Sequence, residues 1–261
     1  MVTGKHLELG IDRSVATITL CRPEKRNAVG TGLLHELGAA LDAIRSDGQL
    51  RAVIVTGSGP VFSAGADIAE MSAMPGRDEF RRFLELIQGT FTALERLAVP
   101  TIAAVNGPAY GGGCELALAC DFRLLAEGAS LGVPEVKIGA LPGAGGSQRL
   151  AHALPPAIAR QMILLGDPLP AADCLRFGLA NAVVPADRLL DTTRAWAERL
   201  CALPPLAVQA GKTLAYLGHN TDLASGMEAE RLTVTSLFET ADRAEGMQAF
   251  LEKRPPTFTG H

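Results

Sequence analysis

Two glutamates, Glu115 and Glu135, are the residues in this chain best placed to do chemistry. Each is flanked mainly by small and apolar residues rather than by other charges, the first within NGPAYGGGCELALACD and the second within LGVPEVKIGALPGAGGSQRL. That setting favours a desolvated cleft, where burial tunes a carboxyl group for acid–base work. The glycines nearby let backbone N–H groups approach a ligand closely. Carboxylates beside exposed amides indicate chemistry on a carbonyl compound.

Two glycine-rich segments can supply those amides. The first, TGSGPVFSAGADI at 56–68, lacks both the GxGxxG spacing and the P-loop lysine, which disfavours a nucleotide loop. Its amides can instead donate to a developing oxyanion, and a plain strand-to-helix turn is the alternative. The second, Gly111 to Gly113, precedes an expected helix whose first N–H groups lack intrahelical partners. An amide there suits an enolate oxygen, and close backbone packing is an equally good explanation.

Three further features have weaker interpretations. The segment RPEKRNA at 22–28 places three cations within five residues, which suits a phosphate, although a solvated loop is the ordinary alternative. Asp67 is interpreted as a helix cap or structural hydrogen-bonding residue in preference to a catalytic acid. Cys114 has no histidine close in sequence to activate it, so we interpret it as a small core residue.

Composition excludes several classes of protein. The chain has 261 residues, a net charge of -4 and only 5% aromatic residues, which argues against nucleic-acid binding. Five widely spaced cysteines and five scattered histidines give no disulfide framework and no metal site. The residues MVTGKHLELG do not have the pattern of a signal or transit peptide, and no apolar run approaches the ~20 residues of a membrane span. We therefore expect a cytoplasmic protein with no membrane partner.

Hydrophobic periodicity predicts an α/β core followed by a helical C-terminal part. Strands are expected at 15–20, 52–56, 101–105, 121–126 and 183–184. Helices are expected at 33–44, 80–97, 114–120, 155–165, 171–177, 187–202, 205–217 and 221–252. The predicted division is a core with the site at 1–200 and a helical region at 201–261.

Taken in order, these segments resemble the crotonase superfamily, and specifically enoyl-CoA hydratase. The matching motifs are RPxxxNA at 22–28, FSAGADI at 62–68, NGPAxGGGCELA at 106–117, Pro134-Glu135, PGAGGSQRL at 142–150 and FLEKRxPxF at 250–258. The resemblance implies an α/β core of ββα units wound as a spiral. It also implies C-terminal helices that mediate a homotrimer or a hexamer built as a dimer of trimers, and an acyl-CoA thioester as the ligand.

The same resemblance implies roles for individual residues. The amides of Ala66 and Gly112 form an oxyanion hole, and the amide of Gly143 positions a catalytic water. The coenzyme A part of the substrate is bound by two further groups. Ala64 and its neighbours Asp67 and Ile68 line the adenine pocket, and Arg22, Lys25, Arg26 and Ala28 approach the phosphates and pantetheine. Lys253 reaches coenzyme A bound to a neighbouring subunit. No metal and no separate cofactor is implied, since coenzyme A belongs to the substrate.

Glutamate at both carboxylate positions resembles the members that add water, in syn fashion, to a 2-enoyl-CoA to give a 3-hydroxyacyl-CoA. Glu115 then accepts the proton of water and Glu135 delivers a proton to C2. Two departures from the family pattern are Ala69, where lysine is frequent, and Val133, where many hydratases have glutamine. The alternatives are an enoyl-CoA isomerase or another crotonase-fold reaction and, less favoured, a non-catalytic scaffold that binds coenzyme A or RNA. The acyl group stays open.

Overall fold

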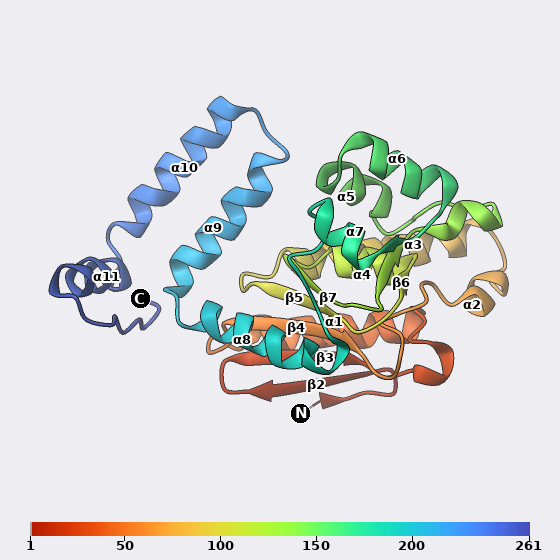
Figure 1. Cartoon of the computed structure of the whole chain (residues 1–261), viewed down its shortest axis with the longest axis horizontal. Helices are drawn as coiled ribbons and strands as arrows, with labels where there is room; N and C mark the ends of the chain where they lie inside the picture. The colour runs from red at the N-terminus through yellow and green to blue at the C-terminus, as the bar shows by residue number, and fades with distance from the viewer. Residues whose placement is uncertain (1) are drawn as a thin grey trace.

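A seven-stranded sheet forms the centre of the chain in the computed structural model, which describes residues 2–261 (Figure 1). Its strand order is β1-β2-β3-β4-β5-β7-β10. The pairs β1-β2 and β2-β3 are antiparallel, and the four pairs from β3 to β10 are parallel. The strands are β1 (Val2–Thr3), β2 (Leu7–Asp12), β3 (Val15–Leu20), β4 (Ala52–Gly57), β5 (Thr101–Val105), β7 (Phe122–Ala126) and β10 (Ala182–Val184).

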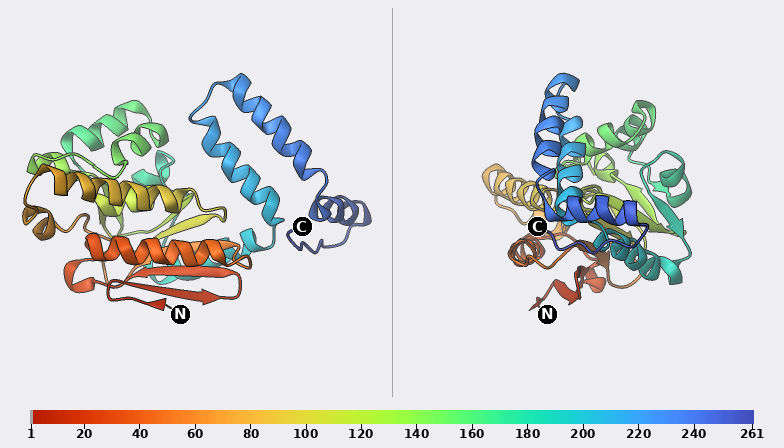
Figure 2. Two further views of the ribbon diagram at one scale, coloured as in Figure 1. Left: turned by 180° about the vertical axis from the view of Figure 1, so that it is seen from behind. Right: turned by 90° about the vertical axis from the view of Figure 1, so that its left-hand side faces the viewer.

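Helices cover both faces of this sheet (Figure 1 and Figure 2). One face carries α1 (Thr31–Ser46) and α3 (Arg77–Glu95), and the other carries α8 (Leu189–Cys201), which contacts β3, β4, β5 and β7. The apolar positions that predicted α1 are buried, among them Leu33, Leu37 and Leu41. The central strands β4 and β5 are buried on both sides, as parallel strands between two helical layers must be.

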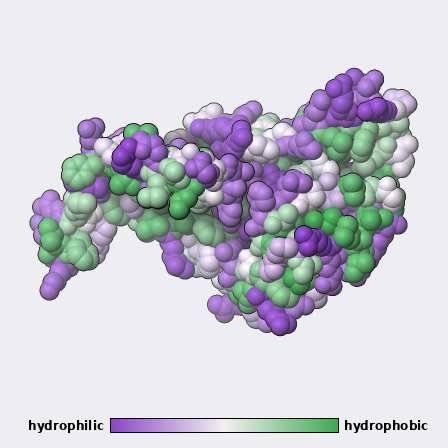
Figure 3. Space-filling model, turned by 90° about the horizontal axis from the view of Figure 1, so that it is seen from above, coloured by the Kyte–Doolittle hydropathy of each residue, from purple (hydrophilic) through white to green (hydrophobic). Residues whose placement is uncertain are grey.

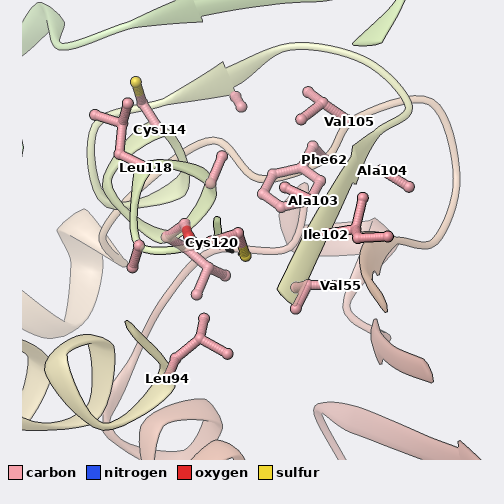
Figure 4. Packing of buried hydrophobic residues seen from close by; sticks show 14 of the residues in the cluster. Val55, Phe62, Leu94, Ile102, Ala103, Ala104, Val105, Cys114, Leu118 and Cys120 are labelled. Atoms are coloured by element: carbon pink, nitrogen blue, oxygen red, sulfur yellow. Dashed lines mark hydrogen bonds between the residues drawn. The ribbon is translucent and has the colours of Figure 1, made fainter. Parts of the chain in front are cut away.

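The hydrophobic core extends from the sheet into the layer that contains both glutamates. Figure 4 shows side chains of β4 and β5, including Val55 and Ile102, near Phe62 and near Cys114 and Leu118 of α4 (Gly112–Leu118). Helix α4 is buried at all seven of its residues. Glu115 is therefore part of a helix that is buried all round, which explains the desolvation of its carboxylate.

A smaller layer completes the core. The strands β6 (Ala109–Tyr110), β8 (Ser130–Gly132) and β9 (Leu169–Pro170) form a three-stranded sheet in the order β6-β8-β9. The remaining elements of the core are the 3-10 helices η1 (Pro23–Lys25), η2 (Pro134–Ile138) and η3 (Ala186–Arg188), and the helices α2 (Ile68–Ser72), α5 (Gly146–Ala153), α6 (Pro156–Leu165) and α7 (Ala171–Arg176).

An arm of three helices, α9 (Pro205–Gly218), α10 (Leu223–Leu237) and α11 (Ala241–Glu252), extends away from the core (Figure 1 and Figure 2). The prediction of one helix over 221–252 is wrong. The chain turns after Leu237, and the hydroxyl of Thr240 accepts a hydrogen bond from the N–H of Arg243 and so begins a new helix. The division at residue 200 stays a prediction.

The five strands predicted from sequence are confirmed, with ends that shift by one residue at most. Strand β2, which contains Gly10, and helix α5, which begins at Gly146 after Gly145, were not predicted. None of the helices within residues 2–261 combines the length and the apolar character needed to cross a bilayer.

Candidate active site

The carboxylate of Glu115 is buried and held by two backbone amides. Glu115 is 2% exposed, and its Oε1 accepts hydrogen bonds from Ala144 N and Gly146 N, each at 2.7 Å. Burial raises the pKa of Glu115, whereas the amides of Gly146 and Ala144, and then the charge of Arg149, lower it. No protein donor within residues 2–261 binds Oε2. One oxygen is thus fixed, and the other can accept a proton from a ligand or water.

Glu135 lies at the start of η2, beside the glycine turn that leads into α4. A Cβ added at Gly111, whose φ is +50°, would lie 2.9 Å from Oε1 of Glu135, so only glycine fits there. Oε2 is buried and has no hydrogen-bond partner among the described residues. Burial raises the pKa of Glu135 to about 7, and the charge of Glu115 acts in the same direction. A buried polar atom with no partner needs an explanation, and a reacting water or substrate supplies one.

The amides of Ala66 and Gly112 lie next to each other. A Cβ added at Gly112 would lie 3.4 Å from Ala66 N. Neither N–H donates to a protein acceptor within residues 2–261. Two backbone hydrogen bonds of 2.9 Å, from Tyr110 N to Ser63 O and from Gly111 N to Gly132 O, join the segments that carry these amides and Glu135. Free amides adjacent to a carboxylate pair can stabilise a developing oxyanion.

Gly143 lies one residue before the amide of Ala144 that binds Glu115. Its N–H has no protein acceptor in the described part of the chain, and its carbonyl accepts a 2.7 Å hydrogen bond from Nε2 of Gln88. The family resemblance implies Gly143 as the amide for the catalytic water, and it does not point to Ala144 and Gly146 as partners of Glu115. All three residues lie in the motif at 142–150, but nothing in a glycine-rich sequence says which amide faces a given carboxylate.

The loop at 22–28 and the segment at 64–68 form one surface near these amides. Ala64 N donates to Arg26 O at 2.9 Å, and Lys25, Arg26, Ala64 and Ile68 are all exposed. Ala28 is buried at 9% exposure beside them. Sequence reasoning missed Asn27, a buried residue whose Nδ2 donates to Ser58 O and Val61 O and so holds the loop in place.

Arg22 and Asp67 pair with each other rather than presenting free groups. Their side chains form an ion pair at 3.3 Å, and Arg22 Nη1 also donates to Ala28 O at 3.3 Å. Asp67 Oδ1 accepts from Glu70 N at 3.3 Å and caps α2, which confirms the interpretation of Asp67 as a cap. Both residues fix the shape of the surface that Lys25 and Arg26 occupy.

Three other residues named in the sequence analysis do not present their side chains to this surface within one chain. Lys253 ends α11, at the end of the molecule opposite α2, so one chain does not bring it to the surface at 22–28 (Figure 1 and Figure 2). Val133 is fully buried in the core, so its side chain does not face solvent. Cys114 is fully buried as well, and burial raises the pKa of its thiol well above the usual range, which excludes a ready nucleophile.

A family model described as enoyl-CoA hydratase/isomerase matches residues 10–261. The chain belongs to the enoyl-CoA hydratase/isomerase family. A probable enoyl-CoA hydratase of Mycobacterium bovis is 42% identical over 248 residues, 95% of each chain. A crotonyl-CoA hydratase of Syntrophomonas wolfei is 41% identical over 97% of this chain and 98% of the relative. The crystal structure of an enoyl-CoA hydratase from Bacillus anthracis superposes with a TM-score of 0.95, at 37% identity, over 98% of this chain and 100% of that chain.

This family likeness over almost the whole chain confirms the predicted fold class, an α/β crotonase fold. The enoyl-CoA hydratase/isomerase match includes the arm as well as the core, because it runs to residue 261.

Proposed function

We propose that this protein is an enoyl-CoA hydratase, a hydro-lyase that adds water reversibly to a 2-enoyl-CoA thioester and gives a 3-hydroxyacyl-CoA. One observation carries the proposal. The buried carboxylate of Glu115, held by two amides, and the half-buried carboxylate of Glu135, with one buried and unpartnered oxygen, lie beside two free backbone N–H groups. The two carboxylates suit the activation of a water molecule, and the two N–H groups suit a thioester oxygen.

The thioester oxygen accepts hydrogen bonds from the N–H groups of Ala66 and Gly112. Addition of water at C3 moves negative charge onto that oxygen as an enolate forms, and fixed donors stabilise this charge without reorganisation. Loss of one such donor raises the barrier by about 2.7–4 kcal/mol in comparable sites. These amides therefore activate the double bond through the carbonyl to which it is conjugated.

The two carboxylates divide the proton transfers. Glu115 is the base, because the amides of Ala144 and Gly146 stabilise its ionised form. Glu135 is the acid, because burial raises its pKa to about 7 and allows it to hold a proton near neutral pH. Water gives a proton to Glu115 as its oxygen attacks C3, Glu135 gives its proton to C2, and the Gly143 N–H orients the water. Addition is syn if both groups act through one water on one face of the double bond.

The coenzyme A part of the substrate fits the surface formed by 22–28 and 64–68. The exposed cations Lys25 and Arg26 face its phosphates, and the backbone around Ala64, Asp67 and Ile68 forms the adenine pocket. Arg22 and Ala28 shape this surface through the hydrogen bond between them. No metal or separate cofactor takes part in this scheme.

The arm supports assembly as a homotrimer or as a dimer of trimers. Exposed apolar residues stand among polar ones on its surface (Figure 3), and Leu223, Phe250 and Leu251 are 79%, 83% and 80% exposed. A monomer rarely leaves such large apolar residues in water over a contiguous area. A neighbouring arm would also bring Lys253 to the coenzyme A of the next subunit. We place the enzyme in the cytoplasm, in fatty acid β-oxidation.

Turnover of crotonyl-CoA tests the proposal, because hydration removes the absorbance of the conjugated enoyl thioester. The wild type should consume crotonyl-CoA, and Glu115→Gln and Glu135→Gln should each lose most of that activity. An isomerase would instead convert a 3-enoyl-CoA without hydrating crotonyl-CoA. A scaffold would bind coenzyme A or RNA and turn over neither thioester. Variants that both keep wild-type turnover would refute the assigned roles.

A further inference from the structure

An ion pair behind Glu115 takes no part in the proposed reaction, yet it contacts the turn that holds this carboxylate. Arg149 of α5 donates from Nε to Glu95 Oε1 at 2.8 Å and from Nη2 to Glu95 Oε2 at 3.0 Å. The two side chains are 16% and 20% exposed. A bidentate pair this well enclosed fixes the plane of the guanidinium group.

The third edge of the guanidinium reaches the turn itself. Arg149 Nη1 donates to Ala144 O at 2.9 Å and contacts Gly145 at the position that a Cβ would occupy. Ala144 N, in turn, donates to Glu115 Oε1, and so does Gly146 N on the far side of Gly145. Arg149 thus binds the turn between the two amides that donate to Glu115.

Helix α3 supports the turn from the same side. Gln88 and Glu95 lie two helical turns apart and hence on one face of α3. Gln88 Nε2 donates to Gly143 O at 2.7 Å, and this carbonyl belongs to the same peptide group as the Ala144 N–H. The amide of Ala144 is therefore held at both ends, by Gln88 on its carbonyl oxygen and by Glu115 on its N–H.

Arg149, Glu95 and Gln88 line a cavity of about 820 Å³, and none of Ala66, Gly112 and Glu135 does. The cavity lies between the core and α9, where Lys212 and Tyr216, together with His219 just after the helix, form its other wall. Lys212 is already paired with Asp121 at 2.8 Å. Arg149 accordingly acts from behind Glu115 and does not touch the reacting atoms.

We propose that Arg149, held by Glu95, is a positioning residue: it aims the Ala144 and Gly146 amides at Glu115 and places a positive charge behind that carboxylate. The kinetic part of this inference rests on the proposed hydratase function. The proposed effect of Arg149 agrees with the groups that shift the pKa of Glu115. Burial raises this pKa, and the amides of Gly146 and Ala144, and then Arg149, lower it. Two carboxylates, Glu115 and Glu135, lie on the side of the site, and the titratable groups around the cavity are Glu95, Cys120, Asp121, Arg123, His152, Lys212, Tyr216 and His219.

The test uses the pH dependence of kcat for crotonyl-CoA hydration together with a carbon-13 NMR titration of the Glu115 carboxyl group. Arg149→Met should lower kcat at pH 7 roughly 10- to 100-fold, with little change in KM. The acidic limb of kcat and the NMR midpoint of Glu115 should both move to higher pH. Arg149→Lys, which keeps the charge, should move both less.

Because Arg149→Met leaves Glu95 without its partner, the Glu95→Gln/Arg149→Met pair serves as a second variant that removes both charges. It should shift the acidic limb and the NMR midpoint in the same direction, by a smaller amount, in a folded protein. His152→Gln is the matched control, since His152 lies on α5 and lines the same cavity. It should leave the pH profile and the NMR midpoint unchanged.

The outcomes separate this inference from the proposed function. An NMR midpoint that moves in a protein without hydratase activity upholds the positioning role and rejects the function. A folded double variant with wild-type kcat, acidic limb and NMR midpoint rejects the positioning role while the function stands.

Discussion

Two substitutions of Glu115 should separate its chemical role from its structural role. In Glu115→Gln the side-chain carbonyl oxygen can still accept from Ala144 N and Gly146 N, now at 2.7 Å to Oε1. Only the base is lost, and a positioned base contributes about 10²- to 10⁴-fold to the rate. In Glu115→Ala the base is lost as well, and two buried N–H groups are left without an acceptor.

Each unsatisfied buried donor costs about 1–3 kcal/mol, so Glu115→Ala should be roughly 2–6 kcal/mol less stable than Glu115→Gln. The assay combines crotonyl-CoA turnover with denaturant unfolding of both variants at one protein concentration. We expect similar, very low turnover in the two variants and a clear gap between their unfolding midpoints. Equal stability of the two variants, or a Glu115→Gln variant within tenfold of wild-type turnover, would refute the reasoning.

Three other outcomes follow from the same geometry. Gly146→Ala places a Cβ 2.9 Å from Glu115 Cγ and 3.0 Å from Oε1, so kcat should fall roughly 10- to 100-fold with KM nearly unchanged, and a normal kcat would contradict the fixed carboxylate. Because Glu135 must be protonated to give its proton to C2, and its pKa is raised to about 7, kcat for hydration should decrease as pH rises through 7. In the reverse reaction Glu135 takes a proton from C2 and Glu115 gives one to the leaving hydroxyl, so dehydration also needs one proton on the pair and should decrease over the same range. A dehydration rate that rises through pH 7 would count against the assignment. Phe250→Asp should lower the mass of the assembly measured by light scattering, whereas the control Ile11→Asp, at a site 48% exposed on β2, should not change it. An unchanged mass in both variants would contradict the proposed role of the arm.

Much of the fold could be predicted because local patterns determine it. The strands at 52–56 and 101–105 are short apolar runs that end at turn residues, and both form central strands of the sheet. The α1 helix has apolar residues at helical spacing, and these residues are buried. The helix boundary at 238–240 was missed because periodicity continues through it, and a single threonine cap decides where α11 begins.

The site could be predicted only in part. The sequence identified Glu115 and Glu135 from their glycine-rich surroundings, and the family resemblance implied different roles for them, but neither could show the contacts that support those roles. Those roles depend on contacts between distant segments, such as the Ala144 and Gly146 amides on Glu115 and Gly111 against Glu135. The role of Lys253 could not be checked in a single chain, because its predicted contact is with coenzyme A bound to another copy of the chain.

The stereochemical course of crotonyl-CoA hydration in D2O tests the central claim most directly. Analysis of the 3-hydroxybutyryl-CoA product gives the position of deuterium and its relation to the new hydroxyl group. Two carboxylates acting through one water predict one deuterium at C2, added to the same face as the hydroxyl at C3. Anti addition, a random mixture at C2, or no hydrated product would contradict the paired action of Glu115 and Glu135.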